Sequence, residues 1–272
     1  MQVRGRRAGE VAALVVLIGF AVLIAVTDPA QSSASDSLAL PPNSRWVDAP
    51  SGDGRSSRVL LLPGSGARPL VVLAASSAGI TSADFVLAGA LRARGMHVAL
   101  ACWFEQPEAA RGPLACPNAR PDAVVSEAHL ADLDAAVDAA KRELGGQTTS
   151  VVVGGYSRGG GLAVLRAANG RPEPVVAIAP LLSGQLLRGD NTPDDVDIIG
   201  AGEPIAAPIL VVHGTSDRVV AYSDSARFVN RVPNASLTSY DGVDHDIAWR
   251  KDLTGRLATE IANWVRARTG SQ

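Results

Sequence analysis

Apolar residues along the chain fall into two alternating patterns. Short continuous apolar runs, typical of strands that are buried on both faces, occur at 69–75, 96–101, 150–154 and 209–213. Longer stretches with apolar residues at the spacing of an amphipathic helix occur at 82–94, 126–144 and 160–168. This alternation predicts an α/β domain over residues 56–270, with a mostly parallel central sheet flanked by helices on both faces.

The alternation is interrupted at 180–208. This stretch contains several Pro and Gly residues and has no clear amphipathic pattern. Long connections without secondary structure of their own are uncommon in compact domains and are often functional. We therefore expect 180–208 to form a short irregular cap over a site, where it would influence the choice of substrate.

The N-terminal residues carry the pattern of a targeting segment. An arginine-rich start precedes an apolar run over 11–26. Residues 1–27 are predicted to be either a cleaved signal peptide or an uncleaved signal anchor, because 8–27 reaches the length of a bilayer span. The arginines favour a cytoplasmic N-terminus and an exported domain. In the uncleaved form, residues 8–27 would attach the protein to the membrane.

Residues 28–55 form the connection between this segment and the domain. They are rich in Ser, Pro and Gly, with a serine-rich stretch at 32–37 and consecutive prolines at 41–42. Such a composition buries little apolar surface, so we predict a flexible tether.

Overall composition narrows the classes of function. The chain of 272 residues is 47% hydrophobic, which is sufficient for a substantial core. Its formal net charge is −2 and its aromatic content is 4%. Proteins that bind nucleic acid usually present a basic surface and aromatic side chains for base stacking, so nucleic acid is not expected as a partner. The oligomeric state is left open by the sequence.

Cys102 and Cys116 are the only cysteines of the chain. An even pair of cysteines in an exported protein suggests a disulfide, which here would close the loop 103–115. Two independently buried thiols are the alternative. A zinc site is not expected, because two cysteines alone cannot make a tetrahedral site and no nearby histidine completes one.

The pentapeptide 155–159 has the pattern G-x-S-x-G and lies between the strand pattern 150–154 and the helix pattern 160–168. A serine on a sharp turn between a strand and a helix exposes its hydroxyl at the edge of the sheet, and the flanking glycines let the backbones pass closely. This context predicts that Ser157 is a nucleophile. The alternative is a glycine-rich turn that happens to contain a serine.

A serine hydroxyl needs a base to remove its proton, and the chain has four histidines. His245 lies in a polar loop before the last helix pattern, which is a usual place for a catalytic base, and we predict this role for it. The alternative is a solvated histidine among aspartates. His97 lies within a strand pattern, His129 is expected on the polar face of a helix beside Asp132, and His213 ends a strand and is expected to shape the following turn.

Asp217 is predicted to orient the base. It follows an apolar strand in a turn at the carboxyl edge of the sheet, where open α/β folds place their ligand sites. The chain order Ser157, Asp217, His245 is that of the α/β-hydrolase fold. The rivals lie in the irregular segment (Asp194, Asp195 and Asp197) or beside the histidine, where they would tune its pKa (Asp244 and Asp246).

An acyl-transfer site also needs N–H donors for the oxyanion. The backbone N–H of Arg158, next after the nucleophile, is expected to supply one, and the loop 76–79 is expected to supply the other. Within that loop Ser77 is the first choice and Ser76 the second.

Together these features resemble the α/β-hydrolase superfamily over nearly all of residues 56–268. Within it, the chain looks most similar to the dienelactone-hydrolase-like esterases and the related acyl-CoA thioesterase and acyltransferase domains. The residues that carry the resemblance are Ser157-Arg158-Gly159, Ala101-Cys102-Trp103-Phe104 and His213-Gly214-Thr215-Ser216-Asp217. The resemblance implies a Ser-Asp-His triad with no metal and no cofactor. One departure affects the expected substrate: Ala75-Ser76 replaces the usual His-Gly before the oxyanion loop.

The sequence therefore predicts an exported serine hydrolase that cleaves a carboxylic ester of a small or lipid-like molecule through an acyl-enzyme. A thioesterase or acyltransferase with the same triad is one alternative. A non-catalytic binding module of the same fold is another.

Overall fold

The computed structural model describes residues 43–103, 116, 125, 127–182 and 205–270. These residues all belong to one compact unit within 38–272. The predicted targeting segment and residues 183–204 of the predicted cap lie outside the described residues. Within the described ranges, no helix is both long enough and apolar enough to cross a membrane.

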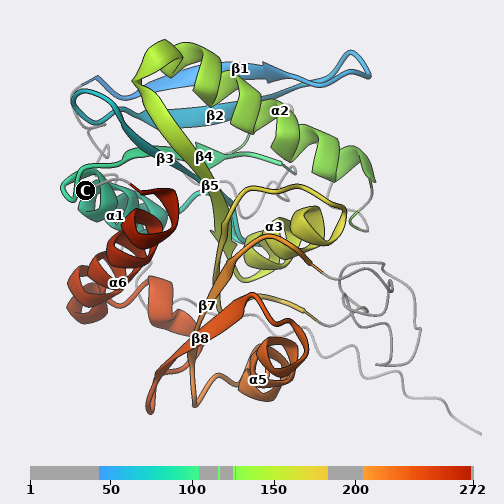
Figure 1. Ribbon diagram of the computed structural model, residues 1–272, viewed down its shortest axis with the longest axis vertical. Coiled ribbons are helices and arrows are strands. Elements are labelled where there is room, and N and C mark those ends of the chain that lie inside the picture. Colours follow the sequence, from blue (N-terminus) through green and yellow to red (C-terminus); the bar gives the residue numbers. More distant parts are fainter. Residues whose placement is uncertain (1–42, 104–115, 117–124, 126, 183–204, 271–272) are drawn as a thin grey trace, which may run out of the picture. The chain divides into compact units, whose positions relative to one another are not determined.

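An eight-stranded sheet forms the centre of this unit, with the strand order β1-β2-β4-β3-β5-β6-β7-β8 (Figure 1). β2 pairs antiparallel with both β1 and β4, and the pairs from β4 through β8 are parallel. The strands are β1 (Arg45–Pro50), β2 (Ser56–Leu62), β3 (Arg68–Ala74), β4 (His97–Ala101), β5 (Thr148–Tyr156), β6 (Val175–Ile178), β7 (Ile209–Gly214) and β8 (Ala235–Tyr240).

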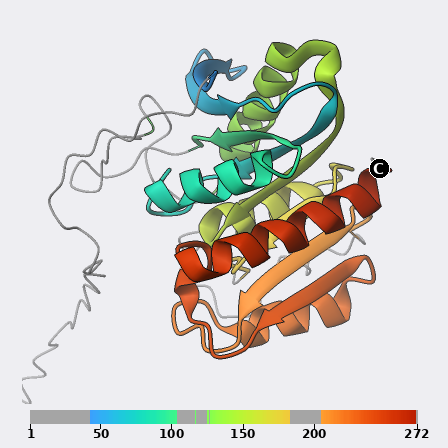
Figure 2. The same ribbon diagram turned by 90° about the vertical axis from the view of Figure 1, so that its left-hand side faces the viewer.

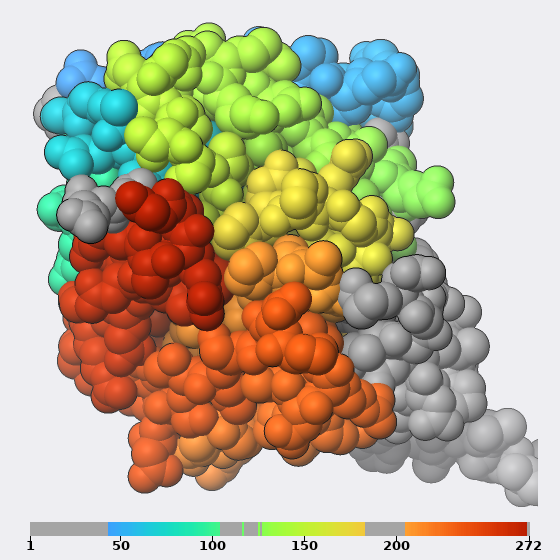
Figure 3. All heavy atoms as spheres, viewed as in Figure 1, coloured from blue at the N-terminus to red at the C-terminus, as the bar shows by residue number. Residues whose placement is uncertain are grey.

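Helices cover both faces of the sheet. α1 (Ser82–Arg92) and α6 (Lys251–Thr269) pack on one face, whereas α2 (Glu127–Leu144), α3 (Arg158–Ala168) and α5 (Tyr222–Arg231) pack on the other (Figures 1 and 2). In the space-filling view, residues of α2 (green) and α6 (red) form continuous parts of the visible surface (Figure 3). The predicted α/β architecture with a mostly parallel sheet is confirmed.

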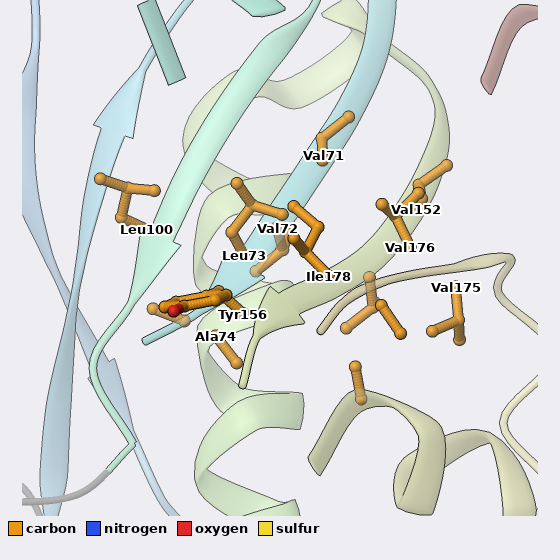
Figure 4. Packing of buried hydrophobic residues seen from close by; sticks show 14 of the residues in the cluster. Val71, Val72, Leu73, Ala74, Leu100, Val152, Tyr156, Val175, Val176 and Ile178 are labelled. Atoms are coloured by element: carbon orange, nitrogen blue, oxygen red, sulfur yellow. The ribbon is translucent and has the colours of Figure 1, made fainter. Parts of the chain in front are cut away.

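The core explains why the central strands are continuously apolar. A strand covered by helices on both faces has no solvent-facing side, so its side chains need not alternate between apolar and polar. Val71, Val72, Val152 and Val176 are all fully buried. Figure 4 shows them among neighbouring apolar side chains of the β3, β5 and β6 strands.

The order of strands fixes the position of a site. From β3 the chain proceeds to β4 on one side, and it then returns to β5 on the other side. The connections that leave the carboxyl ends of β3 and β5 therefore diverge, and ligand sites in open α/β sheets lie at such switch points.

The prediction of a flexible tether over 28–55 is wrong for its second half. Arg45–Pro50 pairs with β2 as an edge strand, and the buried hydroxyl of Ser51 donates a hydrogen bond to Asp132 of α2. Arg45 also forms a salt bridge with Glu143 at 2.9 Å. The sequence concealed this strand because only Ala49 within it is fully buried, so it has no continuous apolar run. Residues 28–42 lie outside the described residues.

Candidate active site

Ser157 occupies a strained turn between β5 and α3. Its backbone has φ 54° and ψ −117°, in a region that residues other than glycine rarely adopt. The Ser157 N–H donates to the Ile178 carbonyl at 2.9 Å, and the Ser157 carbonyl accepts the N–H groups of Gly161 and Leu181, both at 3.0 Å. These bonds to three different segments hold the strained conformation and leave the side chain at the carboxyl edge of the sheet.

The glycines around Ser157 permit close backbone contacts. A Cβ atom on Gly159 would lie 2.2 Å from the Ala74 carbonyl oxygen, and one on Gly155 would lie 2.5 Å from the carbonyl carbon of Gly159. Any side chain at these positions would clash with main-chain atoms. The turn therefore has the geometry that the G-x-S-x-G pattern predicts.

The structure brings Ser157, His245 and Asp217 together. His245 Nε2 lies 3.1 Å from Ser157 Oγ, and His245 Nδ1 lies 2.7 Å from Asp217 Oδ2. The Asp217 side chain is fully buried, and the His245 side chain is 13% exposed. Because a carboxylate can only accept, Nδ1 carries the hydrogen, which leaves Nε2 free to accept the Ser157 proton.

Asp217 is fixed by several donors. Its Oδ1 accepts the N–H groups of Val219 and Val220, both at 2.8 Å, and its Oδ2 also accepts from His213 Nε2 at 2.9 Å. Burial would raise the pKa of this carboxyl, but the hydrogen bonds from His213, His245 and the Val220 N–H outweigh burial and hold the pKa below its usual range. Asp217 is therefore a carboxylate throughout the neutral range.

His245 is held from two sides. Asp244 accepts the His245 N–H at 2.7 Å and the Arg218 N–H at 3.0 Å, so one carboxylate joins the two loops that carry Asp217 and His245. The Tyr156 hydroxyl donates to the His245 carbonyl at 2.5 Å. Burial raises the pKa of Tyr156 well above its usual range, so the hydroxyl remains a donor. Asp246 is exposed, and Asp194, Asp195 and Asp197 lie outside the described residues.

The loop after β3 has two backbone N–H groups, those of Ser76 and Ser77, without an acceptor among the described residues. Ser76 is buried and accepts the Ala78 N–H on its hydroxyl and the Gly79 N–H on its carbonyl. In the described part of the chain, the Ser77 N–H has no acceptor. Gly159, at the start of α3, touches the carbonyls at the start of this loop, so the loop adjoins the helix N-terminus that carries the Arg158 N–H.

A disulfide joins Cys102 to Cys116, with the two Cα atoms 5.3 Å apart. Cys102 directly follows β4, and the next residue, Trp103, donates from Nε1 to the Ala75 carbonyl at 2.7 Å. The disulfide thus lies beside a side chain that holds the loop after β3. Most of the segment that the disulfide closes, 104–115, lies outside the described residues.

The other histidines differ from expectation in two cases. The sequence predicts His129 on a polar helix face, but both His129 and Asp132 are buried, because α2 packs against β2 and against β1, the edge strand that the sequence concealed. His213 contacts Asp217 directly, a role that its place at a strand end did not reveal. His97 lies at the start of β4, on the opposite edge of the sheet from Ser157.

Comparisons with known sequences match short parts of this chain. The family model for serine aminopeptidases (S33) matches residues 197–252, which include Asp217 and His245. A curated non-heme chloroperoxidase from Streptomyces lividans is 48% identical over 42 residues, and the match spans 15% of the length of each chain.

Solved structures match over most of the chain. Est1E from Butyrivibrio proteoclasticus has a TM-score of 0.61 at 18% identity, and the match covers 84% of this chain and 99% of that one. A putative dienelactone hydrolase from Klebsiella pneumoniae has a TM-score of 0.62 at 19% identity, covering 84% and 98%. The esterase Pf2001 from Pyrococcus furiosus has a TM-score of 0.63 at 15% identity, covering 82% and 92%. By its fold, this chain is similar to these α/β-hydrolase and esterase structures.

Proposed function

We propose that the protein is a serine hydrolase that cleaves a carboxylic ester, with Ser157 as nucleophile, His245 as general base and Asp217 as the orienting acid. The observation that carries this proposal is the unbroken series of hydrogen bonds from Ser157 through His245 to Asp217, mounted on a strained turn. A serine, a base and an orienting acid in this geometry are the parts that nucleophilic catalysis requires.

In the proposed reaction, His245 Nε2 takes the Ser157 proton as Oγ bonds to the ester carbonyl carbon. The carbonyl oxygen becomes an oxyanion, which the N–H groups of Arg158 and Ser77 stabilise. His245 then returns the proton to the alkoxide leaving group, and the acyl group remains on Ser157. Water, deprotonated by His245, hydrolyses the acyl-enzyme and regenerates the serine.

The electrostatics support this mechanism. The pKa of Asp217 is held low, so a buried negative charge faces His245 Nδ1 throughout the neutral range. That charge stabilises the imidazolium that forms each time His245 takes a proton. The Ser77 N–H, which has no acceptor among the described residues, and the N-terminus of α3 are the kind of preorganised donors that stabilise an oxyanion.

The names of the structural relatives favour esters over other acyl compounds. Est1E has been solved with bound ferulic acid, and other matched structures are described as esterases or as a dienelactone hydrolase. A thioesterase or an acyltransferase would use the same triad, so the distinction depends on the products formed.

We also propose that the domain is exported. The disulfide between Cys102 and Cys116 supports export, because disulfides persist in oxidising compartments and are rare in the cytosol. The apolar segment 8–27 would then direct or anchor the protein.

The test is labelling of the full-length protein with a fluorophosphonate probe, followed by digestion and mass spectrometry. Ser157 should carry the label, and Ser157→Ala should carry none while retaining the wild-type circular dichroism spectrum. Analysis of the products formed from p-nitrophenyl esters of increasing chain length, with and without an added alcohol acceptor, then separates hydrolysis, which yields the free acid, from acyl transfer, which yields a new ester. Folded wild-type protein that neither takes the label nor cleaves any ester would instead be a non-catalytic binding module.

A further inference from the structure

The acid of the proposed triad contacts two histidines. His245 Nδ1 approaches Asp217 Oδ2 from the site, and His213 Nε2 approaches the same oxygen from the interior of the domain. His213 is the penultimate residue of β7 and is fully buried. The mechanism proposed above assigns no function to it.

The hydrogen bonds around His213 define its tautomer. Its Nε2 faces two acceptors, Asp217 Oδ2 at 2.9 Å and the Val220 carbonyl at 3.2 Å, so Nε2 carries a hydrogen. Its Nδ1 lies 2.7 Å from the hydroxyl of Ser225, a fully buried residue of α5. A hydroxyl can donate to Nδ1, and this completes a buried series of donors that runs from Ser225 through His213 to Asp217.

We propose that His213 is a positioning residue for Asp217, and that Ser225 fixes the His213 tautomer that donates to the carboxylate. This inference rests on the proposed function, because it concerns the acid of that triad. Asp217 Oδ1 is held by two backbone N–H groups, whereas Oδ2 bonds to side chains alone among the described residues. Without His213, only the catalytic histidine itself would bond to Oδ2.

The physical argument concerns geometry and charge together. The Asp217 side chain has no solvent exposure, so water cannot replace a lost donor. A buried carboxylate that loses a donor either shifts toward another one or becomes less favourable in its charged form. A shift of the carboxylate redirects the contact that orients the His245 ring, and a less stable charge weakens that contact. Rates depend steeply on the alignment of reacting groups.

Two amides of different reach provide the main test. The side-chain nitrogen of glutamine occupies nearly the position of a histidine Nε2, whereas that of asparagine reaches only the position of Nδ1. His213→Gln should therefore keep a donor to Asp217 Oδ2, and His213→Asn should lose it. Both variants keep a polar amide in the same buried place.

His97 offers a matched control. It is also fully buried and makes two hydrogen bonds, accepting the Gly64 N–H at 2.9 Å and donating to the Gln147 carbonyl at 3.1 Å. It lies at the opposite edge of the sheet from Ser157. His97→Asn should lower the melting temperature without changing the kcat of the folded enzyme.

The measurements are kcat and KM for p-nitrophenyl acetate, the rate of fluorophosphonate labelling, and the melting temperature of each full-length variant. For His213→Asn, we expect kcat and the labelling rate to fall roughly 10- to 100-fold with KM little changed, because both acylation and deacylation use His245. His213→Gln should recover most of the lost rate. Ser225→Ala, which keeps the ring but removes its hydroxyl donor, should lower kcat about 3- to 10-fold.

The outcomes separate this inference from the proposed function. If wild-type protein is labelled at Ser157 and hydrolyses the ester, but folded His213→Asn does so at the wild-type rate, the positioning role is overturned and the hydrolase stands. Equal losses in His213→Asn and His213→Gln would also overturn it. If His213→Asn fails to fold, the other two variants still test the inference. An unchanged kcat in Ser225→Ala would overturn the role assigned to Ser225. A slow but folded His213→Gln would overturn the role assigned to His213. Absence of labelling in folded wild-type protein would overturn the proposed function itself.

Discussion

The amino edge of the sheet, where the parallel strands begin, and the carboxyl edge, where they end, carry similar residues with different partners. At the amino edge, buried His97 bonds to two backbone groups, and burial lowers its pKa. At the carboxyl edge, equally buried His213 bonds to a carboxylate that also contacts His245. Burial and residue type are the same at both edges, so the difference lies in the partners. A buried histidine indicates a site only when its partner is itself charged and connected to further reactive groups.

The largest expected effect concerns the acid. Asp217→Asn should lower kcat by about 10,000-fold, because an amide presents hydrogens where two histidine N–H groups need an acceptor, and the His245 tautomer is then wrong. The measurement is kcat for p-nitrophenyl acetate, with His97→Asn as the amino-edge control. Near-wild-type activity in Asp217→Asn would mean that Asp217 is not the orienting acid. The carboxyl edge would then not differ in function from the amino edge at this residue.

The same variant gives a pH signature. The pKa of Asp217 lies below its ordinary value of 3.8 in the folded protein, so its stabilisation is fully present above that value and is lost as the pH falls below it. The melting temperatures of wild type and Asp217→Asn should therefore differ most near neutral pH and converge in acid. A constant difference across that range would mean that the charge of Asp217 contributes nothing to stability.

The two edges also differ in how closely the backbone packs around a glycine. Gly159→Val should unfold or inactivate the protein, since its Cβ would lie 2.2 Å from the Ala74 carbonyl oxygen. Gly146→Val, just before β5 at the amino edge, should change the free energy of unfolding by less than about 1 kcal/mol, because a Cβ there meets nothing within 4 Å. Chemical denaturation of both variants measures this. A stable, active Gly159→Val protein would show that the turn around Ser157 does not require a glycine at this position.

The disulfide should stabilise the carboxyl edge selectively. Its cysteines are 14 residues apart in sequence, and reducing it should cost about 3 kcal/mol of unfolding free energy. Because Trp103 adjoins Cys102 and holds Ala75, amide hydrogen exchange should rise in the loop 76–79 more than around Gly64 and His97. The double variant Cys102→Ser, Cys116→Ser should keep its esterase activity in the cold. Equal acceleration of exchange at both edges would contradict a local effect, and free thiols in secreted protein would contradict the bond itself.

The smallest expected effect concerns Tyr156, which bonds to the main chain of His245 and not to its side chain. Tyr156→Phe removes one hydrogen bond to the His245 carbonyl and should cost about 1 kcal/mol of stability, with kcat within about threefold of wild type. Thermal unfolding and ester hydrolysis of the purified variant measure the two effects. A loss of kcat as large as that of His213→Asn would mean that Tyr156 is also a positioning residue.

The sequence predicted the features that are local in the chain. The apolar strand patterns, the turn around Ser157 and the chain order of the candidate triad can each be identified within a short window of residues. β1 escaped prediction because an edge strand needs pairing on one side only and buries few apolar side chains. The roles of His213 and Tyr156 escaped because their partners are defined by tertiary packing, and a residue at a strand end has the same local pattern whatever it contacts.

The bridge formed by Asp244 has a mechanical consequence. It joins the Arg218 and His245 N–H groups, so the loops that carry the acid and the base are coupled although Asp217 and His245 are 28 residues apart. Displacement of this coupled pair would leave the His245–Asp217 contact intact, whereas the 3.1 Å separation of Ser157 Oγ and His245 Nε2 and the Tyr156 contact with the His245 carbonyl would both change. The bridge therefore secures the contact between Asp217 and His245 more than the contact between His245 and Ser157.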